Sequence, residues 1–416
     1  MIGTGLTRLI SDVLPERGPQ RAMIPSTFIN LVGNGLFNTA SVLYFTLVVH
    51  LPAAQVGLGL TIAGLVGLLA GVPAGDLADR HRPRTIVLMT LVVQAASMTA
   101  FVFIHTWAAF ILVVTVDRLA ASANNAARGA LIARVGGDRP AAFRARLRTF
   151  GNLGIVLGTL GAALALQINT AGAYTTLILA NAASYLGCAL LLLRVPNYEP
   201  LPRPKRHRRL AALADRPFAA FAALEGAMGL QYQAVSLLLP IWIAVHTHAP
   251  RWTVAGAFAM NSAVCVLLQA RIGATVETPQ QGGRAFRRAG LLFLVSCPLI
   301  ALCADVPGWL AVVLLAIAIC VHSTGEVWQS SASMALGFGL APDHAQGQYQ
   351  GLLGLGFDAG QALGPAVLIT AVLGIGQAGW LFLGTFLALL GLLGPAVTNW
   401  AERTRSTPPE AVPIAQ

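Results

Sequence analysis

Long, mainly apolar segments alternate with short polar segments along the sequence. The runs at 55–74 and 85–104, for example, contain no charged residue and flank a charge-dense turn. A helix needs ~20 mainly apolar residues to cross the hydrocarbon core of a bilayer. Mainly apolar segments lie near residues 24–50, 54–75, 85–104, 107–132, 147–170, 172–194, 216–246, 252–274, 289–304, 307–337, 349–373 and 376–398. The pattern therefore predicts an all-α integral membrane protein with twelve transmembrane helices.

The composition favours the same class. The chain is 56% hydrophobic and only 10% charged, whereas soluble domains carry roughly 25% charged residues. A transmembrane barrel would show short alternating segments instead. The five cysteines lie in apolar runs without metal-ligand spacing, so we expect buried thiols and neither a metal site nor a cofactor. They are Cys188, Cys265, Cys297, Cys303 and Cys320.

The net charge of +11 follows the predicted topology. All Arg and Lys residues except Arg118 and Arg251 fall on one side of the twelve predicted helices. Positively charged loops mark the cytoplasmic side of a membrane protein. We therefore expect both termini in the cytoplasm and no nucleic-acid partner. The abundance of Arg, Ala and Gly suggests a GC-rich genome, so the expected location is a bacterial plasma membrane.

The predicted helices divide into two sets of six. A cytoplasmic segment (1–23) precedes the first bundle (24–195), a basic linker (196–215) precedes the second bundle (216–398), and a cytoplasmic tail (399–416) follows. A partial repeat supports duplication, because Gly75 and Asp79 are matched in the second half by Gly273 and Glu277 at the same spacing. Two pseudo-symmetric six-helix bundles are common among transporters.

The turn between the second and third predicted helices, Gly-Asp-Leu-Ala-Asp-Arg-His-Arg-Pro-Arg at 75–84, resembles the signature loop of the major facilitator superfamily. The resemblance covers essentially the whole chain and is strongest to the twelve-helix, proton-coupled drug and metabolite exporters. It implies a conformational latch in which an aspartate faces the start of the eleventh helix in the outward-open state. The latch residues would be Gly75, Asp79, Arg80 and Arg84. Arg82 and Pro83 replace residues usual in the family, and residues 341–348 lack the usual basic residue.

Two glycine patterns extend the resemblance to exporters. The fifth predicted helix carries Gly154 and Gly158, and the eleventh carries Gly360, Gly364 and Pro365. Small residues four apart allow close helix packing, and proline bends a helix. The resemblance therefore implies helix-packing and gating roles for these five residues, although glycine and proline are also common in membrane helices generally.

A few charged residues fall inside the predicted spans and away from the span ends. Charges inside a bilayer cost at least ~2.5–3.5 kcal/mol each, which makes them functional candidates. The proton-coupling candidates are Glu326, Asp358, Asp117, Arg118 and Glu225. Glu326 and Asp358 are the first choices, because a membrane carboxylate can bind a proton from one side and release it to the other. Arg118 matches the place of an exporter arginine that is thought to tune such a carboxylate. Structural ion pairs are the alternative.

Neutral polar residues mark a candidate substrate cavity. Asn30, Asn34 and Asn38 recur every four residues, so they form a single stripe on one helix face. The other candidates are Asn124, Tyr232, Gln233, His322 and Gln361. Amides and aromatic rings suit an amphipathic substrate. Interhelical hydrogen bonding is the alternative for any one of them.

These observations predict a secondary active transporter rather than an enzyme. The sequence contains no His-Glu-x-x-His motif, no paired-aspartate motif and no Walker loop. We expect proton-coupled efflux of a small amphipathic drug or secreted metabolite by a monomer in the lipid bilayer. A proton-coupled importer and a non-transporting receptor are the alternatives. An organic-acid carrier is disfavoured, because Arg118 is the only arginine expected inside the membrane.

Overall fold

The structure is a computed structural model that describes residues 18–168, 170–202 and 210–406. Most of the predicted N-terminal segment, the basic run 203–209 of the predicted linker and residues 407–416 of the tail lie outside the described residues. Within the described ranges every regular element is helical and no strand occurs. The prediction of an all-α fold is confirmed.

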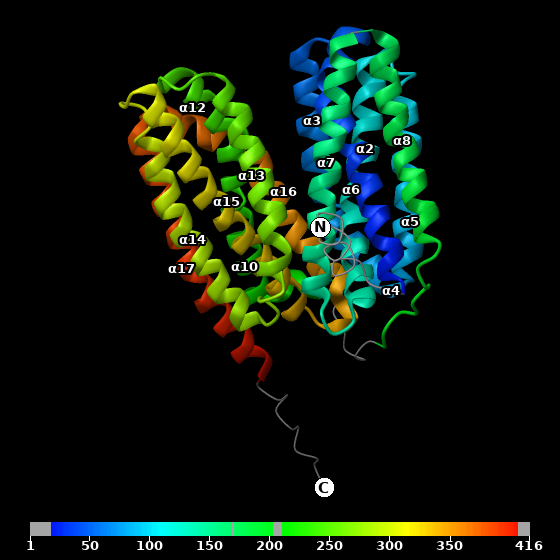
Figure 1. The fold of residues 1–416 in the computed structure, drawn as a ribbon. Helices are drawn as coiled ribbons and strands as arrows, with labels where there is room; N and C mark the ends of the chain where they lie inside the picture. The colour runs from blue at the N-terminus through cyan, green and yellow to red at the C-terminus, as the bar shows by residue number, and fades with distance from the viewer. Residues whose placement is uncertain (1–17, 169, 203–209, 407–416) are drawn as a thin grey trace, which may run out of the picture.

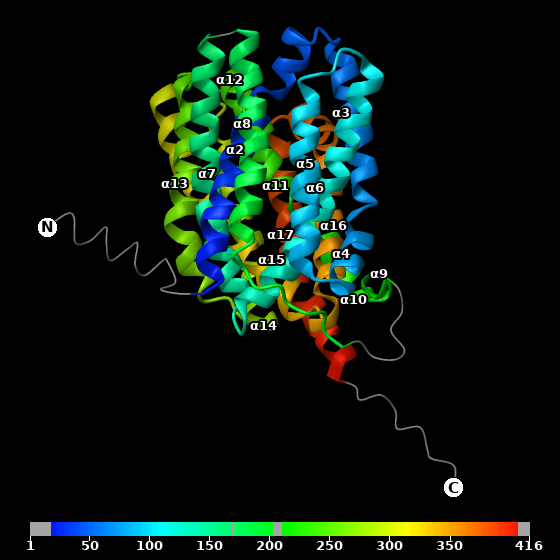
Figure 2. The same ribbon diagram turned by 90° about the vertical axis from the view of Figure 1, so that its right-hand side faces the viewer.

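The helices form two groups that stand side by side (Figures 1 and 2). The first group contains α2 (Gln20–Leu43), α3 (Ala53–Leu68), α4 (Gly71–Arg80), α5 (Pro83–Phe101), α6 (Trp107–Gly136), α7 (Pro140–Ile168) and α8 (Ala171–Leu192). The second group contains α10 (Arg216–Met228), α11 (Leu230–Gln233), α12 (Leu239–His246), α13 (Trp252–Gly273), α14 (Pro279–Ala301), α15 (Gly308–Gly339), α16 (Gln346–Ala371) and α17 (Gln377–Ser406). The short elements are α9 (Ala211–Ala214), the π-helices η1 (Tyr44–Val48) and η2 (Ala234–Leu238), and the 3₁₀-helices η3 (Asp343–Ala345) and η4 (Leu373–Ile375).

Nine of the predicted spans are supported by length and hydropathy. Among the described residues, seven segments can cross a membrane alone, and two pairs bent by 42° and 51° bring the number to nine. The other three predicted spans are α2, α7 and α14, which have 24, 29 and 23 residues and run beside the nine (Figures 1 and 2). Each is interrupted by polar or charged residues. The count of twelve therefore stays a prediction.

Side-chain caps fix where several helices begin. Thr106 and Thr170 accept hydrogen bonds from the backbone of α6 and α8, and Asp215 does the same for α10. Thr278 and Gln281 form a reciprocal capping box at the start of α14. Such caps satisfy N–H groups that a helix leaves without a partner, and each contributes about 1 kcal/mol. They set the turns that separate successive helices.

Large aromatic residues fill the interior of each group. Phe45 lies with ring centroids 5.1 Å from Phe101 and 4.6 Å from Phe110, and Trp242 lies 6.0 Å from Trp380. Many leucines instead point outward, including residues that are 50–70% exposed. Exposed leucines spread over helices of this length fit contact with lipid, because the hydrocarbon tails are as apolar as the side chains.

The two groups meet at the end of the molecule where the C-terminal segment leaves, here called the terminal side (Figure 1). On one side of this contact, Gly71 and Gly75 of α4 pack against Gly351 and Gly347 of α16. A Cβ on Gly75 would lie 2.1 Å from the Gly347 carbonyl oxygen. This contact therefore depends on the absence of side chains.

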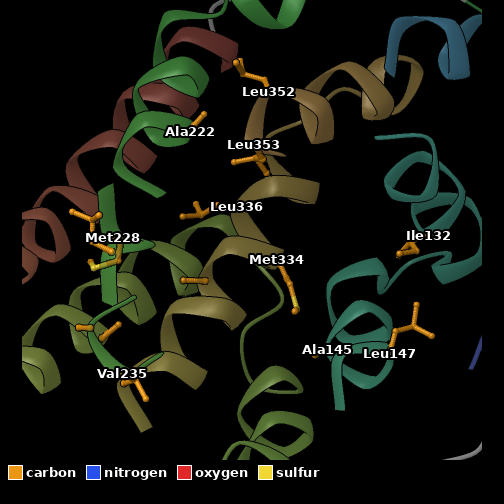
Figure 3. Close-up of a cluster of buried hydrophobic side chains, with 14 of the residues drawn as sticks. Ile132, Ala145, Leu147, Ala222, Met228, Val235, Met334, Leu336, Leu352 and Leu353 are labelled. Atoms are coloured by element: carbon orange, nitrogen blue, oxygen red, sulfur yellow. The ribbon is translucent and has the colours of Figure 1, made fainter. Parts of the chain in front are cut away.

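The groups also meet through α7 and α15. Figure 3 shows Met334 extending from α15 toward Ala145 and Leu147 of α7. A Cβ on Gly273 of α13 would lie 2.5 Å from the Ala145 side chain, so α13 approaches α7 closely as well. Small and apolar residues thus bring the two groups together near the terminal side.

Candidate functional site

Three adjoining pockets lie beside α6: the first is lined by the first group of helices and by Met334 of the second, and the other two are lined by both groups. Their volumes are about 400, 360 and 290 Å³, within the range of small-molecule sites. The first is lined mainly by α2, α5, α6 and α7, the second by α3, α6 and α16, and the third by α7, α11, α15 and α16. Asn125 of α6 lines all three. The pockets therefore adjoin one another around the middle of α6.

The asparagine stripe of α2 lines the first pocket. Asn30, Asn34 and Asn38 all belong to its wall. Asn34 also accepts a hydrogen bond of 3.0 Å from the hydroxyl of Tyr185. Asn124 lines the same pocket while its amide donates to the hydroxyl of Thr90 at 2.8 Å. These side chains therefore face the pocket and bond to neighbouring helices at the same time.

Four arginines line the first pocket: Arg118, Arg128, Arg144 and Arg148. We expected only Arg118 inside the membrane, but Arg128 lies within the same candidate span, Trp107–Gly136. For Arg144 the cause is a helix boundary, since α7 begins at Pro140 and not near residue 147. The extra turns at the start of α7 carry Arg144 into the pocket wall, whereas Arg128 and Arg148 lie near the ends of spans that the sequence already predicted.

Glu326 of α15 contacts the other group of helices. One carboxylate oxygen lies 3.4 Å from the guanidinium of Arg148 on α7, and the other accepts a hydrogen bond of 3.0 Å from Asn261. Arg148 also donates to the hydroxyl of Tyr232 at 2.9 Å. The Glu326 side chain is 11% exposed. An ion pair thus joins the two groups beside the pockets.

Glu225 ends a hydrogen-bonded chain inside the second group. Gln329 donates to the Glu225 carboxylate at 3.1 Å, and Gln231 donates to Gln329 at 3.0 Å. The ring of His322 bonds to Gln231 at 3.0 Å and to Ser296 at 3.1 Å. With the neutral Nε2–H tautomer, every donor in this chain points toward Glu225. His322 is fully buried within the second group and is not part of the walls of the three pockets.

The remaining candidates line the first and second pockets or bond to residues that do. Asp117 lines the first pocket, and its Oδ1 has no hydrogen-bond partner among the described residues. Asp358 lines both the second and third pockets, and Gln361 lines the second. Gln233 donates to Gln361 at 2.5 Å, so it joins α11 to α16. The described residues contain no group of three His, Cys, Asp or Glu side chains that could hold a metal ion.

Asp79 lies at the start of α16. Its carboxylate accepts hydrogen bonds from the backbone N–H groups of Gly347 and Gln348 at 2.7 and 2.9 Å. Arg80 pairs instead with Asp76 at 2.5 Å, one turn back on the same helix. A basic residue before α16 is not needed for this contact, because the helix N-terminus supplies the donors and a partial positive charge.

Arg84, and Arg82 and Pro83, which depart from the family pattern, lie at the turn between α4 and α5. Arg84 donates to the Val195 carbonyl oxygen at 2.5 Å. Arg82 forms an ion pair with Glu199, and Pro83 occupies the first turn of α5. These residues therefore attach the turn to the end of α8, while Gly75 and Asp79 face α16.

The glycine patterns lie at close helix contacts. A Cβ on Gly158 would lie 2.1 Å from the Val32 carbonyl oxygen of α2, and one on Gly154 would lie 2.7 Å from that of Phe28. Gly360 approaches α10 in the same way, with 2.2 Å to the carbonyl oxygen of Gly226. Gly364 packs beside Gln233 and Leu230. Pro365 lies at a 51° bend within α16, where the segment Asp343–Pro365 meets the segment Val367–Ile375.

The sequence of the chain matches the profile of one protein family. Residues 23–365 match the sequence profile of the Major Facilitator Superfamily. No curated protein sequence matches the chain significantly.

Several solved structures are similar in fold. A bacterial homologue of the iron transporter ferroportin in the outward-facing state has a TM-score of 0.74 at 12% identity, covering 93% of this chain and 100% of that one. The human organic anion transporter MFSD10 (TETRAN) has a TM-score of 0.66 at 18% identity, covering 92% and 100%. A variant of the E. coli fucose:proton symporter FucP has a TM-score of 0.69 at 15% identity, covering 94% and 99%.

Proposed function

The chain belongs to the major facilitator superfamily, and from this premise we propose that it couples the efflux of a small amphipathic molecule to proton entry. Efflux would proceed by alternating access, in which the two groups of helices rock about the pockets between them. The observation that carries the proposal is the ion pair between Glu326 and Arg148, which links one group to the other beside the pockets.

Protonation of Glu326 provides the coupling step. In the charged state its carboxylate attracts Arg148 across the interface and accepts a hydrogen bond from Asn261. A proton on Glu326 removes that charge and leaves Arg148 with the hydroxyl of Tyr232, which belongs to the second group. The link between the groups is then weaker, and their relative position can change. One proton thus acts on the contact that the transport cycle must rearrange.

The direction of transport is proposed from topology and packing. If the basic loops mark the cytoplasm, the terminal side is cytoplasmic and the contacts between α4 and α16 close the cytoplasmic side. Protons from outside would then reach Glu326 before the groups rearrange. The two glycine patterns that resemble exporters lie at close helix contacts: Gly154 and Gly158 of α7 lie against α2, and Gly360 of α16 lies against α10. This resemblance to exporters supports efflux.

Inside-out vesicles test this proposal. The lumen is acidified, amphipathic compounds of positive, zero and negative charge are added outside, and lumenal pH is followed. A compound-dependent rise in lumenal pH that is absent from control vesicles would support antiport. Compound uptake driven by protons into right-side-out vesicles would identify an importer. The absence of coupled flux in both orientations would favour a non-transporting receptor.

The coupling residues are tested in the same vesicles. Glu326→Gln should abolish the pH signal while substrate exchange without a gradient stays within a few-fold of wild type, because glutamine resembles the protonated side chain. Asp358→Asn tests the second candidate carboxylate. Glu199→Gln is the matched control, since its ion pair with Arg82 lies within the first group. Full coupling in both Glu326→Gln and Asp358→Asn would refute the assignment of the proton site.

A further inference from the structure

We propose that the substrate is an organic anion whose acidic group binds between Arg128 and Arg144 in the first pocket. This inference rests on the proposed transport function and names its substrate class. The starting point is the charge of the pocket wall, which contains four arginines and a single carboxylate, Asp117. A pocket of this charge attracts anions and repels cations.

Two of the four arginines have carboxylates nearby. Arg148 pairs with Glu326 at 3.4 Å. Arg118 follows Asp117 directly in the sequence and shares the second pocket with Asp358. The charges of these two arginines are therefore at least partly balanced by the protein.

Arg128 and Arg144 contact only neutral groups. Arg128 donates to the hydroxyl of Thr27 at 3.0 Å and to the amide oxygen of Asn30 at 3.4 Å. Arg144 donates to the amide oxygen of Gln350 at 3.0 Å and lies 5.6 Å from the ring centroid of Phe338. In the part of the chain that the structure describes, no carboxylate lies within 4 Å of either guanidinium. An acidic substrate group would supply the missing countercharge.

Arg128 and Arg144 lie within helices and not in a surface loop, which suits a binding site inside the protein. Arg128 lies eight residues before the end of α6, which corresponds to about 12 Å along the helix. Arg144 lies one turn inside α7. Like charges in a partly buried setting are costly unless they are compensated. The planar guanidinium fork matches the two oxygens of a carboxylate, sulfonate or phosphate.

The rest of the pocket suits the body of an organic molecule. Leu31, Phe37, Met98, Leu147 and Met334 line it together with the asparagine stripe. A volume of about 400 Å³ is at the small end of the range for drug-sized ligands. The pocket therefore favours a small molecule with one acidic end and an apolar or aromatic body. The proposal differs from the expectation from sequence, which disfavoured an organic acid because it counted one arginine inside the membrane.

Binding to the purified protein tests this inference without any gradient. Three fluorescent probes share one aromatic body and differ in charge: dansylglycine is an anion, dansylglycinamide is neutral and dansylethylenediamine is a cation. We expect dansylglycine to bind at least about 10-fold more tightly than the other two, since a hydrogen bond to a charged group contributes about 1.5–3 kcal/mol. Equal affinities, preference for the cation, or no binding of dansylglycine would overturn the inference.

Variants locate the anion site. Arg128→Gln and Arg144→Gln should each weaken dansylglycine binding about 10-fold or more and leave dansylglycinamide binding unchanged. Arg144→Lys should restore part of the loss, because it keeps the charge without the fork. Arg146→Gln is the matched control: it removes the same charge from α7 at a residue outside the first pocket's wall. If Arg128→Gln and Arg144→Gln both bind dansylglycine as the wild type does, the arginines serve only the contact between the groups and the inference is wrong.

The binding assay and the vesicle assay fail independently. Tight, arginine-dependent binding of dansylglycine without any coupled flux would uphold the anion site and contradict the proposed transport function. Proton-coupled flux of neutral or cationic compounds, with no preference for anions, would uphold the proposed function and overturn the anion site. Each variant is first checked for a wild-type elution profile and melting temperature, so that a loss of binding reports on the site.

Discussion

Replacement of Asp79 by asparagine should release the contact between α4 and α16. The wild-type carboxylate accepts two backbone N–H groups, from Gly347 and Gln348, at the start of a 26-residue helix. The substitution removes a negative charge from the helix N-terminus, which costs about 0.3–2 kcal/mol. It also turns an amide NH₂ toward one of the two N–H groups, and a buried donor without a partner costs about 1–3 kcal/mol. The terminal-side-closed state should therefore lose about 3 kcal/mol, which is about 100-fold in population.

Distances between spin labels measure this shift. Asp138 and Gln280 are exposed on opposite groups, next to the ion pair between Arg139 and Glu277. In the wild type we expect one short distance between labels at these two positions. In Asp79→Asn a longer distance should appear with a comparable population if the wild type favours the closed state by about 100:1.

The matched control is Glu199→Gln, which removes a carboxylate from a pair with Arg82 inside the first group. It should leave the distance distribution unchanged. An unchanged distribution in Asp79→Asn as well would refute the reasoning, because it would mean that the two hydrogen bonds contribute nothing to the balance between states. Equal shifts in both variants would point to a general charge effect.

Two further substitutions test packing. Gly158→Val should lower the melting temperature of the purified protein, because even a Cβ would lie 2.1 Å from the Val32 carbonyl oxygen. Gly172 faces open space, so Gly172→Ala should melt as the wild type does. Equal melting temperatures of the two variants would contradict the close contact at Gly158. His322→Ala should destabilise the protein by about 1–3 kcal/mol, since it removes the ring that bonds to Ser296 and leaves the buried amide oxygen of Gln231 without its partner. Transport by the folded fraction should persist, because His322 lies outside the pocket walls, and a complete loss of transport would show that the buried chain takes part in coupling.

Much of the fold could be predicted from local sequence. Runs without charge specify spans because a bilayer leaves few alternatives to a helix. The spacing of Asn30, Asn34 and Asn38 placed one helix face against a pocket, and the structure has all three in its wall. The contact of Asp79 with the start of α16 followed only from the family resemblance, since no local pattern links residues so far apart.

Arg118 was predicted inside a span, but the other three arginines of the first pocket were not recognised from hydropathy, because a charged helix end reads as a loop. A helical periodicity was nevertheless present. Arg144 and Arg148 are four residues apart, and Arg118, Asn125 and Arg128 follow one another at seven and three residues, so each set shares a helix face. For His322 the sequence predicted a place in the cavity wall that the structure does not show. Its place on α15 indicated a polar face, but only the packing of α11 and α14 shows that this face is buried.

The contacts that close the terminal side are suited to reversal. On one side, α4 and α16 meet through glycines and through the hydrogen bonds of Asp79. On the other, the exposed ion pair of Arg139 and Glu277 contributes at most about 1 kcal/mol. A two-state balance that a ligand or a proton can shift needs a gap of only a few kcal/mol. The hydrogen bonds of Asp79 and the ion pair of Glu326 are contacts of this size, so in the proposed mechanism a single proton on Glu326 is able to shift the balance even though apolar residues also pack between the groups.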